Sequence, residues 1–198
     1  MAILLFNRWD FSSVQVKDQG LKKYINLVPI VVPKTNGKYG TMSIHKVKMS
    51  IVERLITKLF VPGHKGKKHK LTSGHVVGTY QNIAGSVRDG FAIIETKTKK
   101  NPIQVLIDAI ENGAMYEEVM GYRVGGMISR KAVVVSPQRR LDMALRLIAQ
   151  EIFFKSFHNK KTFANVLADS LIEIAANDQR SNVIRERQRL EKEAEGAR

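Results

Sequence analysis

Apolar residues recur at intervals of three and four through most of residues 51–174, and this spacing restricts the chain to a fold made mainly of helices. Five such apolar stripes can be separated, and they begin near Ser50, Val77, Asn101, Ser136 and Thr162. The third is the most regular and runs through Ile103, Leu106, Ile107, Ile110 and Ala114. A core of five helices is therefore expected.

Small polar residues and prolines mark where several of these helices begin and end. Ser50 and Glu53 have the spacing of a capping box, in which the two side chains satisfy free backbone N–H groups at a helix start. Asn101-Pro102 and Ser136-Pro137 each combine an N-cap residue with a proline in the first turn. Pro62-Gly63 is expected to end the first helix.

The apolar period changes beyond Gly113. Residues 116–124 and 127–135 are rich in strand-forming side chains and flank Gly125-Gly126, a pair able to adopt the positive φ angles of a two-residue turn. We expect a β-hairpin at about 116–135 that protrudes from the core. From Gln179 onward apolar residues are sparse among charges, which predicts a peripheral C-terminal helix.

The first 45 residues are interrupted by Pro29, Pro33, Gly37 and Gly40 and are predicted to form an extended basic arm. Segments of this kind often become ordered only on a partner. The expected organisation is an N-terminal arm (1–45), a helical core that carries the hairpin (46–178), and a C-terminal helix and tail (179–198). The fold class is mainly α.

Positive charge is distributed unevenly along the chain. The 198 residues contain 33 Lys and Arg against 18 Asp and Glu, a formal net charge of +15. Residues 1–70 hold 14 of the basic residues and 3 acidic ones, and residues 137–161 hold 6 and 2, whereas the remaining segments are nearly neutral. Solubility requires only a modest net charge. This segregation indicates a polyanionic partner.

Three basic clusters are candidate phosphate contacts. The first lies in the loop predicted for 64–70, and the arm adds Lys34 and Lys38 beside Tyr39. The second is Arg139-Arg140, in a first helical turn where the dipole disfavours cations by about 0.3–1 kcal/mol, a cost that a bound anion would offset. The third follows a helix end and contains Lys155, Lys160 and Lys161. Solvated loops and dipole-favoured capping are the competing interpretations.

The hairpin carries its own basic residues, Arg123, Arg130 and Lys131. Its Gly125-Gly126 tip is small enough to approach a nucleic-acid backbone closely, and a two-stranded ribbon fits a groove or a single strand. The alternative is an ordinary charged turn.

Residues for catalysis, metals or cofactors are not recognisable in the sequence. The chain has no Cys and no phosphate-cradling glycine motif, and the three histidines at 64, 69 and 75 lie among lysines without nearby carboxylates. Glu117-Glu118 is expected to form an internal salt bridge, and Asp169 and Glu173 to share a solvated helix face or a cation. We expect a protein that is not an enzyme and binds neither metal nor cofactor.

Membrane insertion and secretion are also not expected. The longest apolar runs, 3–6 and 28–32, are far below the roughly 18 residues needed to span a bilayer. Residues 1–6 lack the basic lead and long apolar segment of a signal peptide. A cytosolic protein is expected.

Several motifs in combination resemble the family of small-subunit ribosomal protein seven, in its archaeal and eukaryotic branch. The most specific runs are NPIQVLIDAIEN at 101–112 and AVVVSPQRR at 132–140, with Gly125-Gly126 between them. Further matches are SIVERL at 50–55, FNRWD at 6–10, YINL at 24–27 and LAD at 167–169. The resemblance extends over nearly the whole chain.

The resemblance implies binding to the 3′ major domain of small-subunit rRNA and a role in nucleating assembly of the subunit head. It also implies that the hairpin, with Arg123, Gly125, Gly126, Arg130 and Lys131, approaches exit-site tRNA and mRNA, and that the protein contacts ribosomal protein eleven. The rRNA-binding candidates become Lys34, Lys38, Lys46, Lys48, Lys65, Lys67, Lys68, Lys70, Arg139, Arg140, Lys155, Lys160 and Lys161.

Two other functions are compatible with a basic helical chain. A DNA-binding regulator would read bases with side chains of a recognition helix and would commonly be a symmetric dimer. An RNA-processing enzyme would need a clustered acid and base or a metal site. Duplex-DNA competition and incubation with labelled RNA separate these functions from rRNA binding.

Overall fold

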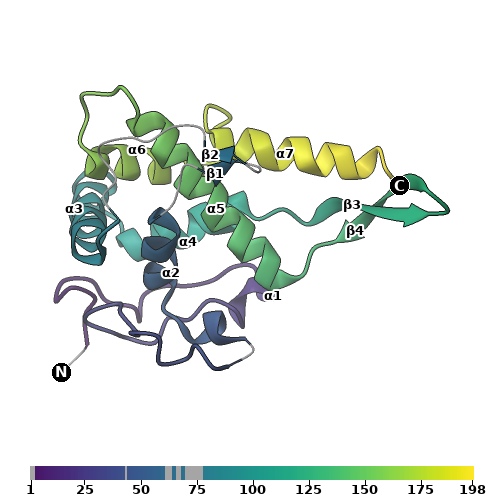
Figure 1. Cartoon of the computed structure of the whole chain (residues 1–198). Helices are drawn as coiled ribbons and strands as arrows, with labels where there is room; N and C mark the ends of the chain where they lie inside the picture. Colours follow the sequence, from purple (N-terminus) through teal and green to yellow (C-terminus); the bar gives the residue numbers. More distant parts are fainter. Residues whose placement is uncertain (1–2, 43, 61–63, 66–67, 70–77) are drawn as a thin grey trace.

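The computed structural model describes residues 3–42, 44–60, 64–65, 68–69 and 78–198. Within this part of the chain, five helices form the core, as the apolar spacing predicts (Figure 1). They are α2 (Ile51–Leu59), α3 (Tyr80–Thr98), α4 (Pro102–Gly113), α5 (Pro137–Ser156) and α6 (Phe163–Ala175).

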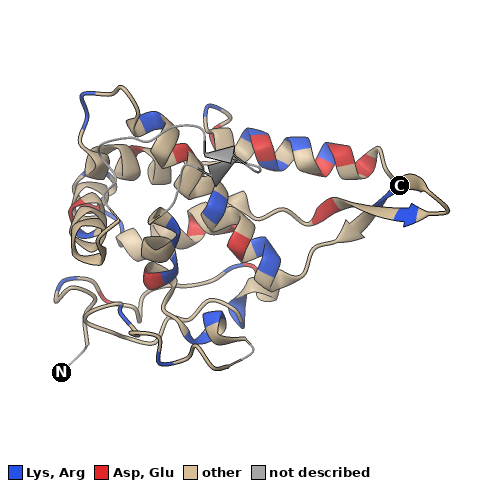
Figure 2. Ribbon diagram, viewed as in Figure 1, with Lys and Arg blue, Asp and Glu red and all other residues tan. Residues whose placement is uncertain are grey.

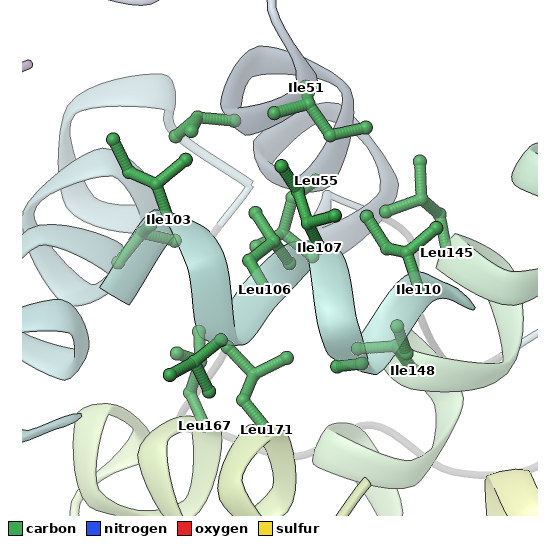
Figure 3. Packing of buried hydrophobic residues seen from close by; sticks show 14 of the residues in the cluster. Ile51, Leu55, Ile103, Leu106, Ile107, Ile110, Leu145, Ile148, Leu167 and Leu171 are labelled. Atoms are coloured by element: carbon green, nitrogen blue, oxygen red, sulfur yellow. The ribbon is translucent and has the colours of Figure 1, made fainter. Parts of the chain in front are cut away.

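Helix α4 occupies the centre of this core. Its four isoleucine and leucine residues from Ile103 to Ile110 are fully buried. In Figure 3 they are surrounded by Ile51 and Leu55 of α2, by Leu145 and Ile148 of α5, and by Leu167 and Leu171 of α6. Burying each such side chain contributes about 1.5–3 kcal/mol, so α4 holds three neighbouring helices on one apolar centre.

The helix starts follow the sequence signals in part. Asn101 caps α4 by accepting a hydrogen bond from the Ile103 N–H at 3.0 Å, and Pro102 lies in the first turn. The capping box at Ser50 and Glu53 is wrong, because the Glu53 carboxylate accepts hydrogen bonds from the backbone N–H and the hydroxyl of Thr35, both at 2.7 Å. Thr35 of the N-terminal segment thus takes the place of the Ser50 backbone N–H as the donor to Glu53.

The predicted hairpin is present as β3 (Glu117–Val124) and β4 (Met127–Val134), joined at Gly125-Gly126. Both glycines have positive φ, +55° and +98°, as a two-residue turn of this hand requires. Helix α7 (Asn182–Glu195) begins on the core, where Val183 and Ile184 are buried, and runs beside the hairpin (Figure 1). The Ala132 N–H donates to the Ala197 carbonyl at 3.3 Å, which ties the chain end to β4.

The N-terminal segment is irregular in backbone but not detached. Among its described residues, the helical elements are α1 (Gln19–Lys22) and the 3-10 turn η1 (His45–Lys48). Six of its apolar side chains nevertheless join the core cluster: Leu5, Trp9, Phe11, Val14, Leu21 and Ile25. The first half of the segment expected to be an arm is therefore packed on the helices, and only residues after about 27 lie mainly on the surface.

The predicted loop at 64–70 contains two short paired strands, β1 (His64–Lys65) and β2 (Lys68–His69), with Lys65 opposite Lys68. Positions 67, 70, 75 and 77 of the sequence predictions, and the expected helix end at Pro62-Gly63, lie outside the described residues. Among the described helices, none is long and apolar enough to cross a membrane.

Candidate nucleic-acid interface

Five exposed lysines of the N-terminal segment form a surface that we call the lysine face: Lys22, Lys23, Lys34, Lys38 and Lys48. Within the described part of the chain, no Asp or Glu oxygen lies within 4.0 Å of any of their ammonium groups. Figure 2 shows that blue segments predominate over red ones along this lower side of the molecule. Its positive charge is therefore available to an external anion.

Aromatic rings lie beneath these cations. The Lys34 ammonium is 5.0 Å from the centre of the Tyr80 ring, and the ammonium groups of Lys38 and Lys48 are each 5.9 Å from the centre of the Tyr39 ring. Burial, together with the nearby Glu53 carboxylate, raises the pKa of Tyr80 to about 12, so its hydroxyl stays protonated and donates to the Pro33 carbonyl at 2.8 Å.

A second cationic group lies on the seam between α2 and α5. Asp142 of α5 is paired with Lys46 and with the buried Arg54 of α2, both at 3.2 Å. Burial raises the pKa of Asp142, but hydrogen bonds and charge from Lys46 and Arg54 outweigh it and hold that pKa below its ordinary value. One turn further along each helix, Lys58 and the exposed Arg146 add positive charge, and burial lowers the pKa of Lys58.

The predicted phosphate site at Arg139-Arg140 has to be corrected for Arg140. That side chain is 7% exposed, and its guanidinium pairs with Asp18 at 2.7 Å, donates to the Met115 carbonyl at 3.1 Å and lies 4.1 Å from the centre of the Tyr116 ring. The anion that offsets the helix dipole is thus a protein carboxylate. Arg140 holds the N-terminal segment to α5 and is not free for phosphate.

Arg139 is in a different situation. It makes two hydrogen bonds to the Glu118 carboxylate, at 2.6 and 2.8 Å, but its side chain remains 54% exposed. The hydrogen bond that Arg139 donates to Glu118 raises the pKa of Arg139. Its outer face stays accessible, so Arg139 remains a candidate RNA contact. Glu118 thus pairs with Arg139, and Glu117 pairs with Arg198 at 2.7 Å. Together these two ion pairs confirm the internal salt bridge predicted for Glu117-Glu118.

The third basic cluster is also partly neutralised. Lys155 lies between Glu151 and Glu173, at 2.6 and 2.5 Å, and Lys161 pairs with Asp169 at 2.9 Å, an aspartate that also binds Lys97. Asp169 and Glu173 therefore take separate cations. Lys160 is exposed and forms no ion pair with a described residue. Lys155 stabilises the contact of α5 with α6, and Lys160 is the most available cation here.

The hairpin projects its predicted basic residues away from the core. Arg123, Arg130 and Lys131 are exposed and lie opposite Ile128, Gly121 and Met120 in the strand register. Several apolar side chains near the tip are exposed as well, including Met127 at 79% and Ile128 at 77%. A β-ribbon with apolar tips and flanking arginines offers both base and phosphate contacts.

Sequence reasoning missed part of the lysine face. Lys22 and Lys23 are both exposed, and Lys23 lines the same groove as Lys48, but neither was predicted as a contact. Their adjacency within the segment that holds most of the excess charge was the available signal. Lys22 is the last residue of the short helix α1 and Lys23 is its C-cap, while at the other end Asp18 caps the helix by accepting from the Gly20 N–H at 2.8 Å.

Acidic and histidine side chains are the candidate metal ligands among the described residues. No group of three or more His, Asp or Glu side chains there is arranged to hold a metal ion. The carboxylates of the structure are mostly engaged by basic side chains, as on α7, where Arg189 binds both Glu186 and Glu193. Available cations without an acid and base pair are typical of a binding surface.

A basic helical body with a projecting hairpin and an unneutralised lysine face is typical of proteins that bind a polyanion such as a nucleic acid. The family model described as Ribosomal protein S7p/S5e matches residues 21–198. The chain belongs to this family and is accordingly a structural component of the small ribosomal subunit, not an enzyme.

Relatives match over the full length. The chain is 40% identical over 198 residues to the small ribosomal subunit protein uS7 of Nanoarchaeum equitans, with all of both chains covered. It is 41% identical over 200 residues to that of Methanococcus maripaludis strain S2, again with complete coverage, and 41% identical over 196 residues to that of Archaeoglobus fulgidus, covering 99% of this chain and 95% of the relative. These similarities confirm the archaeal type of the family.

Proposed function

We propose that the chain binds the 3′ major domain of small-subunit rRNA through the lysine face and helps to nucleate assembly of the subunit head. The observation that carries this proposal is the set of five exposed lysines without a carboxylate partner in the described structure. Each such lysine can neutralise a phosphate and release its counterions. The helical core holds these cations in fixed relative positions, so several RNA helices are oriented together.

The remaining predicted contacts extend this surface. Four further cations keep exposed side chains: Lys46, Arg139, Lys160 and Lys161. All except Lys160 are paired with a carboxylate, and exchanging that carboxylate for an RNA phosphate would leave each of them paired. Lys65, Lys67, Lys68 and Lys70 are proposed from their sequence alone. Arg140 and Lys155 serve the fold and are left out.

The hairpin is proposed to approach exit-site tRNA and mRNA with Arg123, Gly125, Gly126, Arg130 and Lys131, beside a contact with ribosomal protein eleven. Support comes from its projection beyond the core and from its exposed basic and apolar side chains (Figure 1). The small Gly125-Gly126 tip leaves room for a nucleic-acid backbone.

A salt titration with transcribed 3′ major-domain RNA tests the rRNA proposal. If about six phosphates are neutralised, the logarithm of the affinity should fall against the logarithm of the salt concentration with a slope of roughly −4 to −5. Salt-insensitive binding, or equally tight binding to duplex DNA, contradicts the proposal. Cleavage of the labelled RNA would instead favour a processing enzyme.

Paired and unpaired lysines provide a matched comparison. Replacing Lys22 and Lys34 by Gln should weaken binding and reduce the steepness of the salt slope by about 2, or about 1 for each phosphate contact. The control replaces Lys17 and Lys97, which are also exposed but pair with Asp108 at 3.0 Å and Asp169 at 2.5 Å. An equal loss in both double variants would show that only net charge matters.

A further inference from the structure

A groove of about 430 Å³ lies within the lysine face, between the end of α1 and η1. Four apolar side chains line it: Ile25, Val28, Ile30 and Val47. The half-buried ring of Tyr39 belongs to the same lining. The groove therefore offers an aromatic and aliphatic surface at a place where the surrounding molecule is strongly basic.

The charges around the groove are all positive. Lys23 and Lys48 line it, and the Lys38 ammonium lies 5.9 Å from the centre of the Tyr39 ring. No acidic residue lines it, and the Glu53 carboxylate that accepts from the lining residue Thr35 belongs to a buried side chain. An occupant must therefore combine an apolar part with negative charge.

The polar groups of the groove are already engaged within the protein. The Asn26 amide donates to the Lys48 carbonyl at 2.6 Å and accepts from the Val28 N–H at 2.9 Å, and the Thr35 hydroxyl donates to Glu53. Few groups remain to read the edge of a particular base. Recognition by stacking is tolerant of base identity, because every base has a π-face.

We propose that this groove binds one unpaired nucleotide of the small-subunit rRNA, with its base stacked on Tyr39 and its flanking phosphates at Lys23, Lys38 and Lys48. The inference rests on the proposed rRNA-binding function and assigns a specific subsite within it. The flat face of a base can pack against the aromatic and aliphatic walls of the groove, whereas the carboxylates of an acidic peptide cannot. The three lysines can pair with the phosphates on either side of that base.

Substitutions at Tyr39 separate stacking from charge. With the full chain and 3′ major-domain RNA, Tyr39→Phe should bind within about twofold of the wild type, whereas Tyr39→Leu should lose about 5- to 150-fold in affinity. The salt slope of Tyr39→Leu should stay unchanged, because no cation is removed. Replacing Lys23 and Lys48 by Gln should instead flatten the slope.

A direct signal comes from Tyr39→Trp. Emission from an indole in this groove should be quenched when RNA binds, while Trp9, the only native tryptophan, is 3% exposed and should be unaffected in the wild type. Binding without quenching, or unchanged affinity of Tyr39→Leu, overturns the proposed subsite. Displacement of the RNA by a poly-glutamate peptide, with quenching by that peptide alone, would assign the groove to a protein segment and also overturn it. Failure of the wild type to bind RNA would reject the proposed function itself.

Discussion

Two adjacent arginines illustrate how environment decides the role of a side chain. Arg139 and Arg140 have the same charge and lie in the same helical turn, yet one faces solvent and the other is enclosed by Asp18, the Met115 carbonyl and the Tyr116 ring. A buried guanidinium has to be satisfied by the protein, because water cannot reach it. Arg140 therefore connects three separate parts of the chain, while Arg139 keeps an accessible face.

The two arginines should differ sharply in their effect on stability. Arg140→Ala leaves Asp18 half enclosed without its partner, and breaking a buried pair in this way typically costs about 3–5 kcal/mol. Arg139→Ala removes an exposed pair and should cost less than about 1 kcal/mol. Urea unfolding of both variants measures the difference, and similar midpoints would show that Arg140 is not structural.

The same pair predicts a dependence on acid. Burial raises the pKa of Asp18, but hydrogen bonds from Arg140 and the Gly20 N–H, with the charge of Arg140, bring it below the ordinary value of 3.8. A depressed folded pKa contributes stability that is fully present above 3.8 and is lost as the pH falls through the lower folded value. Asp18→Asn should therefore flatten the loss of unfolding free energy as the pH falls below 3.8, whereas an unchanged pH profile would contradict the pairing.

At the scale of helices and strands, local signals were sufficient where the partner is close in sequence. Asn101-Pro102 and the apolar stripe of α4 could be predicted because cap, proline and periodicity all act within one helix. Gly125-Gly126 predicted the hairpin turn for the same reason. Helices and turns that are stabilised by contacts between residues close in sequence can therefore be predicted from the sequence.

Contacts between distant residues account for the sequence predictions that did not hold. Glu53 meets Thr35, 18 positions away, instead of capping its own helix. Lys155 meets Glu173 on the next helix, and Arg140 meets Asp18 across 122 positions. A charge run shows where cations are abundant, but not which of them a distant carboxylate will neutralise. For this reason the sequence could name Lys34, Lys38 and Lys48 as candidates, but only the structure shows that they have no carboxylate partner among the described residues.

A pair of helical glycines tests the packing of α3. At Gly90 an added Cβ would lie 2.8 Å from Leu167 Cδ2 and 3.2 Å from the Ala164 carbonyl oxygen, whereas at Gly85 nothing lies within 4 Å. Gly85→Ala should stabilise the protein by up to about 1 kcal/mol through helix propensity. Gly90→Ala should lose that gain and destabilise by about 1–3 kcal/mol because α3 and α6 must separate. Thermal melts of the two variants measure this difference in stability. Equal shifts in melting temperature would show that α3 and α6 do not approach closely at Gly90.

For the molecule as a whole, internal pairing removes much of the charge that the sequence displays. Acidic residues on α4, α5, α6 and β3 neutralise basic residues from distant segments, as in the pairs of Lys17 with Asp108 and Lys97 with Asp169. Helix α7 alternates both signs along its length (Figure 2). The excess positive charge then concentrates on the N-terminal segment, whose first half is anchored in the core and can present the rest in a defined position.

This anchoring predicts that the N-terminal segment folds with the core before any RNA is bound. Trp9 donates to the Glu95 carboxylate at 3.2 Å and its ring centre lies 5.7 Å from that of Phe91, both on α3. In the free protein its emission should be that of a buried indole and should change in the same urea transition as the far-ultraviolet circular dichroism, because one core unfolds cooperatively. Trp9→Ala should cost about 3–5 kcal/mol. If the segment became ordered only on RNA, free Trp9 would emit as an exposed indole, shift when RNA is added, and tolerate substitution without loss of stability.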